Sequence, residues 1–335
     1  MRVVMLANAA SGRGRKGIGA AVVSRAAQAL QRAGHEVAHL SVADVRERRE
    51  MLSESLVNAD VLVIAGGDGT VHHALGACVA AGVPVYHLPL GTENLFARHF
   101  GMKCDGEVLV RKIMNFGRER AHPLCADASR ELAHPKPLPA PAPEGGASGM
   151  VDVVRASWGS QSRMFGIMAS IGPDASVVAR LASVRRGGIS HLSYVAPAVA
   201  EMMGAYLPSI NVVVDGKEVV RGERGMLIVA NSPEYALGVN PARGASMRDG
   251  VLDVVFMPTS SAVGAGLWLA RCAMRMQFEG DSRCEGARVA TGRRVSVEFC
   301  DVGEKKMMQL DGECVLVEGG NVVGFEVLAG VLRVL

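Results

Sequence analysis

The chain has 335 residues, of which 49% are hydrophobic and 21% are charged, and its formal net charge is +3. A chain of this length and composition can bury a large core, and we expect it to form two domains. The small net charge gives no sign of a nucleic-acid partner, and the few aromatic residues are not interleaved with basic ones as a base-stacking surface requires. The composition therefore indicates a globular protein and argues against nucleic-acid binding.

Seven cysteines are scattered along the chain, and no two of them have Cys-x-x-Cys spacing. This pattern predicts reduced thiols and argues against a zinc site. The apolar run before Asn8 is too short for a signal peptide, and no segment reaches the roughly 18 apolar residues that a spanning helix needs. We therefore expect a cytoplasmic protein, with any membrane contact peripheral and on the inner face.

Strand and helix patterns alternate up to about residue 120. Strand patterns occupy residues 3–7, 36–40, 61–65 and 83–88, and helix patterns occupy residues 19–33 and 45–56 and begin again at residue 71. Such alternation predicts a parallel sheet, whose ligands bind beyond the carboxyl ends of the strands. Three of these strands run into polar loops that contain glycine, so we expect a ligand at that edge of the sheet.

The segment at residues 60–70 (DVLVIAGGDGT) joins a buried strand to a glycine-rich turn with one carboxylate. Gly66, Gly67 and Gly69 let the backbone approach a ligand, and the start of the next helix offers N–H groups to an anion. Asp68 would repel bare phosphate, so we expect a divalent cation between them. No lysine follows the glycines, which excludes the Gly-x4-Gly-Lys loop. The same residues also fit an ordinary turn that closes a strand.

After about residue 150 the patterns become rich in valine and typical of strands, at residues 151–156, 210–214, 226–230, 251–257 and 295–299 and in the last 30 residues. Asp215-Gly216 between two such patterns predicts a two-residue hairpin. Helix patterns lie at residues 176–184, 192–206 and 262–278. We expect a second domain made mainly of antiparallel sheet, with the active site between the two domains.

Two further segments are notable for their composition. Residues 133–149 are rich in proline, glycine and alanine, which predicts a surface loop. Residues 262–276 form an apolar helix pattern interrupted by Arg271 and Arg275. Its apolar face fits a core helix or a helix that lies on a membrane surface.

The glycine turn and five further segments, in sequence order, resemble motifs of the diacylglycerol kinase catalytic-domain family. Besides the glycine turn, they are residues 8–12 (NAASG), 89–98 (PLGTENLFAR), the second-domain signatures at 169–178 and 248–254, and 310–313 (LDGE). The resemblance implies an α/β fold. A parallel-sheet nucleotide domain like that of NAD kinases and phosphofructokinases would take residues 1–122. A β-rich, sandwich-like lipid-substrate domain would take residues 123–335, and its last strands can return to the first domain.

That resemblance implies a kinase of lipid metabolism and phospholipid biosynthesis, similar to soluble bacterial lipid kinases and to sphingosine kinases. Its cofactors would be ATP and Mg²⁺, its partner a lipid substrate, with diacylglycerol as the family default, and a homodimer stays open. An NAD kinase shares the glycine turn, but residues 89–98 and 310–313 argue against one. A non-catalytic regulator that binds nucleotide or lipid is the other alternative.

The resemblance also assigns site residues. Its nucleotide site comprises Asn8, Ser11, Gly12, Ser41, Gly66, Gly67, Asp68, Gly69, Thr70, Val71, His72 and Thr92. Ser41 fits a strand-end cap equally well. Arg13, Arg15 and Lys16 fit either contact with a triphosphate or a solvated cluster.

Two carboxylate sites follow from the same resemblance. A structural magnesium site would use Ser246, Asp249 and the carbonyl of Val251, although Asp249-Gly250 alone reads as a turn. Glu313 would be the general base, with Asp311 as its orienting or metal-linked neighbour and Asp68 as a further catalytic carboxylate. We expect the carboxylates at 311 and 313 to face one side if the segment is extended, although Asp311-Gly312 alone reads as a hairpin turn.

One expected residue is missing from its place. Relatives carry an Ile-Asp-Leu-Gly strand after the Gly-Thr-x-Asn segment, whereas residues 121–127 here read AHPLCAD, with Pro123 at the aspartate's position. Asp127 and His122 are the substitutes available nearby. This departure predicts a rearranged carboxylate network or altered activity, and it motivates the regulator alternative.

Overall fold

The computed structural model describes residues 1–8, 18–42, 49–121, 149–173, 175, 207–273, 286–301 and 306–335. The chain divides into two compact units: unit 1 is Met1–Met150 with Leu332–Leu335, and unit 2 is Val151–Val331. The domain boundary expected between residues 122 and 123 lies outside the described residues, as do the helices expected at 176–184 and 192–206. No helix in the described part of the chain is long and apolar enough to cross a membrane.

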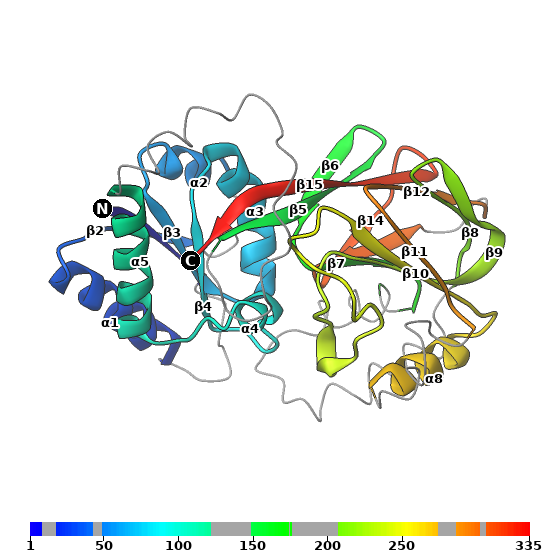
Figure 1. The fold of residues 1–335 in the computed structure, drawn as a ribbon, viewed down its shortest axis with the longest axis horizontal. Helices are drawn as coiled ribbons and strands as arrows, with labels where there is room; N and C mark the ends of the chain where they lie inside the picture. The colour runs from blue at the N-terminus through cyan, green and yellow to red at the C-terminus, as the bar shows by residue number, and fades with distance from the viewer. Residues whose placement is uncertain are drawn as a thin grey trace. The chain divides into compact units, whose positions relative to one another are not determined.

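Unit 1 is built on a parallel sheet in the order β4-β3-β1-β2 (Figure 1). Its strands are β1 (Arg2–Asn8), β2 (Glu36–Val42), β3 (Val61–Gly66) and β4 (Val85–Pro89). Every residue of β3 is buried, as in a central strand covered on both faces. The parallel sheet predicted from the sequence is confirmed.

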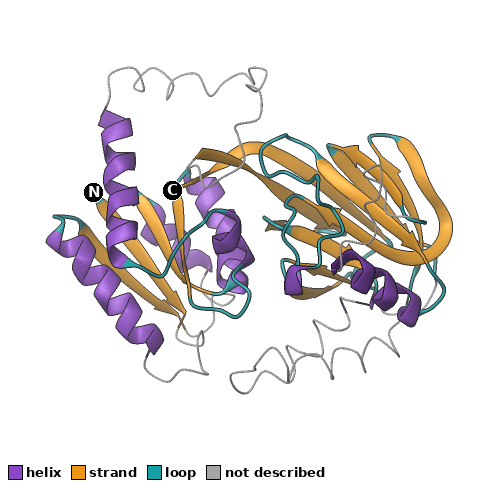
Figure 2. Cartoon of the chain, turned by 60° about the horizontal axis from the view of Figure 1, so that its bottom comes forward, coloured by secondary structure: helices purple, strands orange, loops and turns teal. Residues whose placement is uncertain are grey.

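Helices cover both faces of that sheet (Figure 2). They are α1 (Ile18–Arg32), α2 (Arg49–Leu56), α3 (Asp68–Ala81), α4 (Leu95–His99) and α5 (Gly106–Ala121). Helix α1 packs against α5, and α2 packs against α3. A Cβ atom at Gly106 would lie 3.2 Å from that of Ala29, so α5 approaches α1 closely where it begins. The sequence analysis did not predict α4 and α5.

Unit 2 is made mainly of antiparallel strands, as the sequence predicted. They are β5 (Gly149–Trp158), β6 (Gln161–Phe165), β7 (Met168–Ile171), β8 (Ser209–Val214), β9 (Lys217–Ala230), β10 (Leu252–Pro258), β11 (Arg288–Gly292), β12 (Arg294–Phe299), β13 (Met307–Leu310), β14 (Glu313–Leu316) and β15 (Val322–Val334), with the 3-10 turn η3 (Ala236–Gly238) and helix α8 (Ala262–Ala273). Strand β15 ends in unit 1, where Val334 pairs with Val85 in parallel.

The long strand β9 organises the core of unit 2. It pairs with β8 along its first half and with β7 and β10 along its second half. Buried side chains from both sets of strands, such as Val212, Val297, Leu227 and Phe256, form one apolar cluster. This arrangement explains why these strands alternate buried and exposed residues or are buried throughout.

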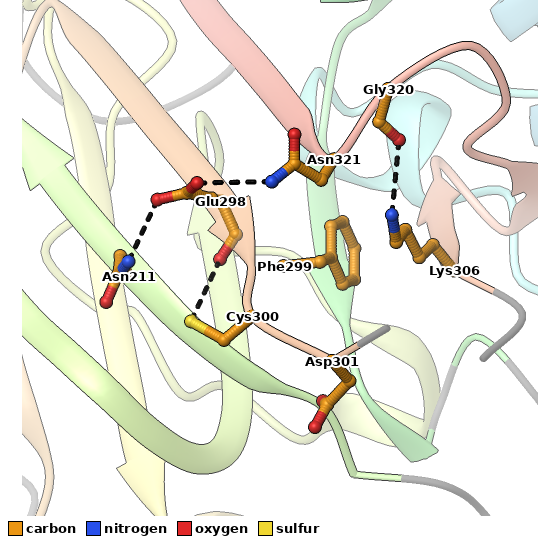
Figure 3. Close-up of a pocket in the computed structure, with 8 residues that line it drawn as sticks. All are labelled: Asn211, Glu298, Phe299, Cys300, Asp301, Lys306, Gly320 and Asn321. Carbon is orange, nitrogen blue, oxygen red and sulfur yellow. Dashed lines mark hydrogen bonds between the residues drawn. The ribbon is translucent and has the colours of Figure 1, made fainter. Parts of the chain in front are cut away.

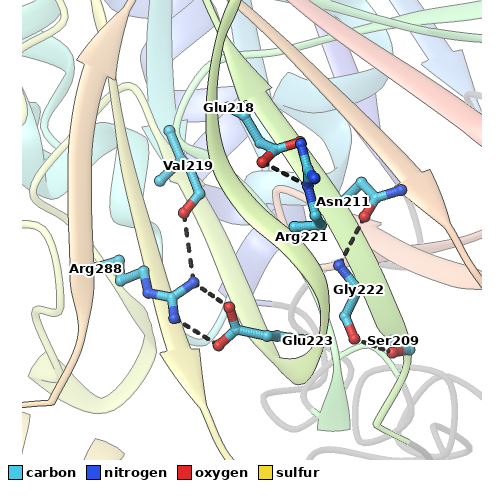
Figure 4. Close-up of polar contacts among 8 residues, drawn as sticks. All are labelled: Ser209, Asn211, Glu218, Val219, Arg221, Gly222, Glu223 and Arg288. Atoms are coloured by element: carbon cyan, nitrogen blue, oxygen red, sulfur yellow. Dashed lines mark hydrogen bonds and ion pairs between the residues drawn. The ribbon is translucent and has the colours of Figure 1, made fainter.

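Polar contacts fix the hairpin between β8 and β9. Asp215 (φ 46°) and Gly216 (φ 80°) both adopt left-handed backbone conformations, as a two-residue type I′ turn requires, so the predicted hairpin is confirmed. Beyond the turn, the Gly222 N–H donates to Asn211 Oδ1 at 2.7 Å (Figure 4). The guanidinium of Arg288 on β11 donates to the carboxylate of Glu223 at 2.6 Å. These contacts tie three neighbouring strands together.

Candidate functional site

Strand β3 passes into helix α3 through a single residue, Gly67. The helix begins at Asp68, earlier than the predicted start at residue 71, so Asp68, Gly69 and Thr70 form its first turn. The N–H groups of Thr70 and Val71 donate to Gly67 O at 2.9 and 3.3 Å. The N–H groups that precede Thr70 in this turn have no i−4 carbonyl within the helix, and the positive end of the helix dipole lies here, so this end of α3 suits an anion.

Close packing of two loops explains the glycines of this turn. A Cβ atom at Gly66 would lie 2.4 Å from Thr70 Oγ1. A Cβ atom at Gly91, in the loop after β4, would lie 2.6 Å from Gly67 Cα. Because neither clash can be relieved without moving the backbone or a buried side chain, the β3–α3 turn and the loop after β4 form one packed structure.

Asn94 and Asp68 complete the connection between these loops. Asn94 has a left-handed backbone (φ 49°). Its side chain accepts the Gly91 N–H at 2.8 Å and donates to Gly91 O at 2.9 Å. Asp68 Oδ1 accepts the Phe96 N–H at 3.1 Å, at the start of α4. Asp68 is thus both the acidic residue of the first turn of α3 and a cap of α4.

The other predicted nucleotide residues divide into three groups. Asn8, the last residue of β1, donates from Nδ2 to Thr70 Oγ1 at 3.1 Å, so these two side chains are brought together. Ser41 and Thr92 are exposed, whereas the side chains of Val71 and His72 are buried at 2% and 4% exposure, so only their backbone can meet a ligand. Ser11 and Gly12 lie outside the described residues, together with Arg13, Arg15 and Lys16.

In unit 2, Asp311 and Gly312 form the turn between β13 and β14. Their φ values are 48° and 80°, and Leu310 pairs with Glu313 across the turn. The segment is therefore not extended. The carboxylates at 311 and 313 were expected to face one side only if this segment was extended, and that condition is not met. The alternative, a hairpin turn at Asp311-Gly312, is the one that the structure shows.

The Asp311 carboxylate anchors a second turn. It accepts the N–H groups of Gly166 and Ile167, both at 2.8 Å, and of Met168 at 3.1 Å. The Asp311 N–H in turn donates to Met168 O at 2.9 Å. Backbone donors stabilise a carboxylate in a fixed orientation. Asp311 therefore holds the β6–β7 connection against the hairpin that carries Glu313.

Three carboxylates gather near the turn before β10. Asp152 on β5 is 1% exposed, and its oxygens accept the N–H groups of Gly250 at 2.8 Å and Gly330 at 2.7 Å. Burial, and then the charge of Asp249, raise the pKa of Asp152. Burial also raises the pKa of Asp249, and burial followed by the charge of Asp249 raises the pKa of Asp253 to about 6. The Arg293 charge opposes this shift at Asp152, so burial is the main reason that these carboxyl pKa values are raised.

The donors expected to hold magnesium lie in this turn. Val251 N–H donates to Asp249 Oδ1 at 3.1 Å, and the Arg248 N–H donates to Ser246 Oγ at 3.3 Å. Among the described residues, no group of three or more His, Cys, Asp or Glu side chains is arranged to hold a metal ion. The expected set is of another kind, since it combines one carboxylate, one hydroxyl and one carbonyl. Hard oxygen donors of this kind are the type that Mg²⁺ prefers.

Asp152 is a buried carboxylate that was not named among the candidate residues. Pro123, His122 and Asp127, at and near the position expected for a strand aspartate, lie outside the described residues. The next described strand after α5 is β5, and its residues 151–154 read VDVV, close to the expected Ile-Asp-Leu-Gly. A lone aspartate within a valine run was the available signal, but residues 122–148 separate it from α5.

A surface pocket of about 580 Å³ lies elsewhere in unit 2 (Figure 3). It is lined by Asn211, Glu298, Phe299, Cys300, Asp301, Lys306, Gly320 and Asn321. The Glu298 carboxylate accepts from the amides of Asn211 and Asn321 at 2.9 and 3.1 Å. Most of its lining residues are polar or charged, and none is a predicted site residue, so it is not the apolar channel that a lipid chain would fill.

Comparisons with protein families match both halves of the chain. Residues 2–124 match the model of the diacylglycerol kinase catalytic domain, and residues 167–335 match the YegS C-terminal NAD kinase beta sandwich-like domain. Two relatives named diacylglycerol kinase come from Mycobacterium tuberculosis strains CDC 1551 / Oshkosh and ATCC 25618 / H37Rv. Each is 24% identical over 265 residues, which is 78% of this chain and 74% of the relative.

Solved structures show the same fold. A protein of Bacillus anthracis strain Sterne aligns with a TM-score of 0.66 and 16% identity, over 99% of this chain and 96% of its own. A diacylglycerol kinase structure from that strain aligns with a TM-score of 0.62 and 15% identity, with the same coverage of both chains. A parallel-sheet unit followed by a β-rich, sandwich-like unit is therefore an arrangement that known proteins share.

Proposed function

Because the chain belongs to the diacylglycerol kinase catalytic-domain family, we propose that it transfers the γ-phosphate of ATP to the hydroxyl of a lipid, with diacylglycerol as the default acceptor. The observation that carries this proposal is the turn from β3 into α3. There the end of a central parallel strand, the start of a helix and the Asp68 carboxylate occur together. That combination suits a magnesium-bound phosphate donor.

On the donor side, the first turn of α3 would bind the phosphates through backbone N–H groups. Asn8 and Thr70 are already hydrogen-bonded to each other and would border that turn, while the exposed Thr92 hydroxyl can bond a phosphate or ribose oxygen. When bound, Mg²⁺ would supply positive charge to the triphosphate. Asp68 fits this role because its carboxylate is held at the junction of the two packed loops.

On the acceptor side, Glu313 would accept the proton of the lipid hydroxyl. The lipid oxygen forms a bond to the γ-phosphorus, the bond from that phosphorus to the β-phosphate oxygen breaks, and ADP leaves. A base of modest strength suffices, because the transition state of phosphoryl transfer is loose and the proton leaves late. Asp311 would act by fixing the hairpin on which Glu313 stands.

We also infer that Asp152 takes the part of the strand aspartate expected at Pro123. Three observations support this: its place on β5, its burial, and the charge of Asp249, which raises the pKa of Asp152. If Asp152 takes that part, the missing aspartate at Pro123 is no longer an argument for a non-catalytic regulator. The Ser246, Asp249 and Val251 donors would then hold a structural Mg²⁺ beside Asp152.

Peripheral contact with a membrane is part of the proposal, since a lipid acceptor resides in a bilayer. Helix α8 buries Ala262, Ala265, Trp268 and Cys272, which confirms that one of its faces is core. On the rest of its surface, Val263 and Leu267 are 53% and 64% exposed. An apolar helix surface of this kind suits the interface of a bilayer.

The test is transfer of radiolabel from γ-labelled ATP to vesicles that contain diacylglycerol, a sphingoid base or another neutral lipid, with the products separated by chromatography. We expect label in at least one lipid. A parallel reaction with NAD tests the alternative acceptor. Label in no lipid would contradict the proposal, and label in NADP would replace it with NAD phosphorylation.

A further inference from the structure

His87 is a buried histidine next to the turn between β3 and α3. It lies on β4 opposite Ile64 of β3, and it is 1% exposed. Its Nε2 atom is 3.0 Å from Gly66 O. Because a carbonyl oxygen only accepts, Nε2 carries the proton and donates. Burial lowers the pKa of His87 against the opposing effects of the Gly66 carbonyl and the Asp68 charge, which favours a neutral ring.

The hydrogen bond from Nε2 to Gly66 O satisfies one of the two ring nitrogens of His87. In the described part of the chain, Nδ1 is buried and has no hydrogen-bond partner. A polar ring in a strand interior is costly unless its hydrogen bond is needed, and an apolar side chain would fill the same space without that cost. The position therefore favours a donor directed at Gly66 O.

The Gly66 carbonyl has a second donor, the Leu90 N–H, at 2.7 Å. Two donors on one oxygen fix the orientation of the peptide that joins Gly66 to Gly67. In a planar trans peptide the C=O and N–H bonds point in opposite directions. With its carbonyl directed at His87 and Leu90, this peptide directs the Gly67 N–H away from them, at the end of β3 where we place the phosphates.

The side chains of Asp68 and Asn94 bond to Phe96 N–H and to Gly91, in and after the loop that follows β4. Gly66 and Gly67 have no side chains, and the Cβ positions at Gly66 and Gly91 are blocked by Thr70 and by the Gly67 backbone. A stabilising side chain must therefore come from a neighbouring strand. His87 supplies it from β4.

We propose that His87 is a positioning residue of the phosphate-donor site: its imidazole fixes the Gly66–Gly67 peptide, and through it the N–H group that contacts the nucleotide phosphates. The role rests on the proposed ATP site. His87 itself touches neither substrate.

The test compares two replacements at this position with one at its neighbour. His87→Leu replaces the N–H donor with an apolar side chain of similar bulk. His87→Gln keeps an N–H donor at a similar distance from the backbone. Tyr86→Phe is the matched control. The Tyr86 hydroxyl donates to Lys103 O and accepts the Lys103 N–H, both at 3.0 Å, so its loss removes buried hydrogen bonds from the same strand without touching Gly66.

ATP affinity is measured by calorimetry on the full chain with Mg²⁺, and kinetics are measured for ATP and for the lipid acceptor. We expect His87→Leu to weaken ATP binding and raise KM for ATP about tenfold, with kcat and the lipid KM changed less than about twofold. His87→Gln should stay within about threefold of the wild type. Tyr86→Phe should lower Tm and leave ATP affinity unchanged.

Each other outcome decides between the claims. If the wild-type chain binds no ATP, the proposed function fails and this role fails with it. If it binds ATP and His87→Leu binds equally well, or if Tyr86→Phe weakens binding as much as His87→Leu, only the role of His87 is refuted. If His87→Leu does not fold, His87→Asn against His87→Gln decides, since the shorter amide cannot reach Gly66 and should weaken binding.

Discussion

Replacing Asp68 separates its structural role from its chemical one. The carboxylate accepts the Phe96 N–H at 3.1 Å and so caps α4. Loss of a helix cap costs about 1 kcal/mol, which lowers Tm by a few degrees in a chain of this size. If Asp68 also holds the cation of the phosphate donor, Asp68→Ala should lower turnover by about 100-fold or more, far beyond the effect of the lost cap.

Two further variants separate the loss of the α4 cap from the loss of the carboxylate charge. Asp68→Asn keeps an oxygen that can cap α4 but removes the charge, so it should fold with nearly unchanged Tm and lose turnover like Asp68→Ala. Asp105 caps α5 by accepting the N–H groups of Glu107 and Val108 at 2.8 and 3.2 Å. Asp105→Ala should therefore lower Tm by a similar amount and keep turnover.

The assay pairs thermal unfolding with label transfer from ATP to the lipid acceptor. The reasoning would be refuted if Asp68→Asn kept normal turnover, because the charge would then have no part in the reaction. It would also be refuted if Asp105→Ala lost as much turnover as Asp68→Ala. In that case the loss would follow from weakened helix caps in unit 1.

The remaining predictions concern unit 2, the buried histidine and the membrane. Glu313→Gln should lower kcat about 100-fold or more at unchanged Tm, whereas Asp311→Ala should lower unfolding free energy by about 2–3 kcal/mol in urea titrations, since it strands three N–H donors. Asp152→Ala should lower both turnover and Tm, and unchanged turnover would remove it from the network. The lowered pKa of His87 means that the unfolded chain binds more protons below about pH 6.5. Stability should therefore fall with acidification below that pH, and urea titrations at pH 7 and pH 5 should show a smaller fall for His87→Gln than for the wild type. Leu267→Glu should lower sedimentation with anionic vesicles several-fold without changing soluble ATP affinity.

The strands of unit 1 were predictable because burial alone specifies them. Residues 61–65 are apolar without interruption, and every one of them is buried in β3. Helix α5 could also have been predicted, since Leu109, Ile113 and Phe116 recur at helical spacing and are all buried. The early start of α3 was harder to predict, because glycine and aspartate are poor helix formers that the first turn nevertheless accepts.

Features that depend on distant contacts could not be read from the sequence. Nothing local shows that Asp311 accepts N–H groups from residues 166–168. The return of the last strand to unit 1 was suggested by the family resemblance and not by any local pattern. The turn at Asp311-Gly312 was one of the two interpretations of this segment. Because of the turn, the Asp311 carboxylate binds backbone N–H groups, and the Glu313 carboxylate is left as the proposed base. The role of His87 could not be predicted, because a single histidine in a strand pattern does not indicate which group its ring will bond.

The most direct test of the central claim is the fate of the γ-phosphate of ATP. Wild type, Asp68→Asn and Asp105→Ala are incubated with γ-labelled ATP, Mg²⁺ and vesicles that contain diacylglycerol, and label is followed in lipid and in free phosphate. If the protein is a lipid kinase whose donor site contains Asp68, wild type and Asp105→Ala should give labelled lipid, and Asp68→Asn should give almost none. Equal labelling by all three would contradict the donor site, and label that appears only as free phosphate, with every lipid in the panel, would contradict a lipid kinase.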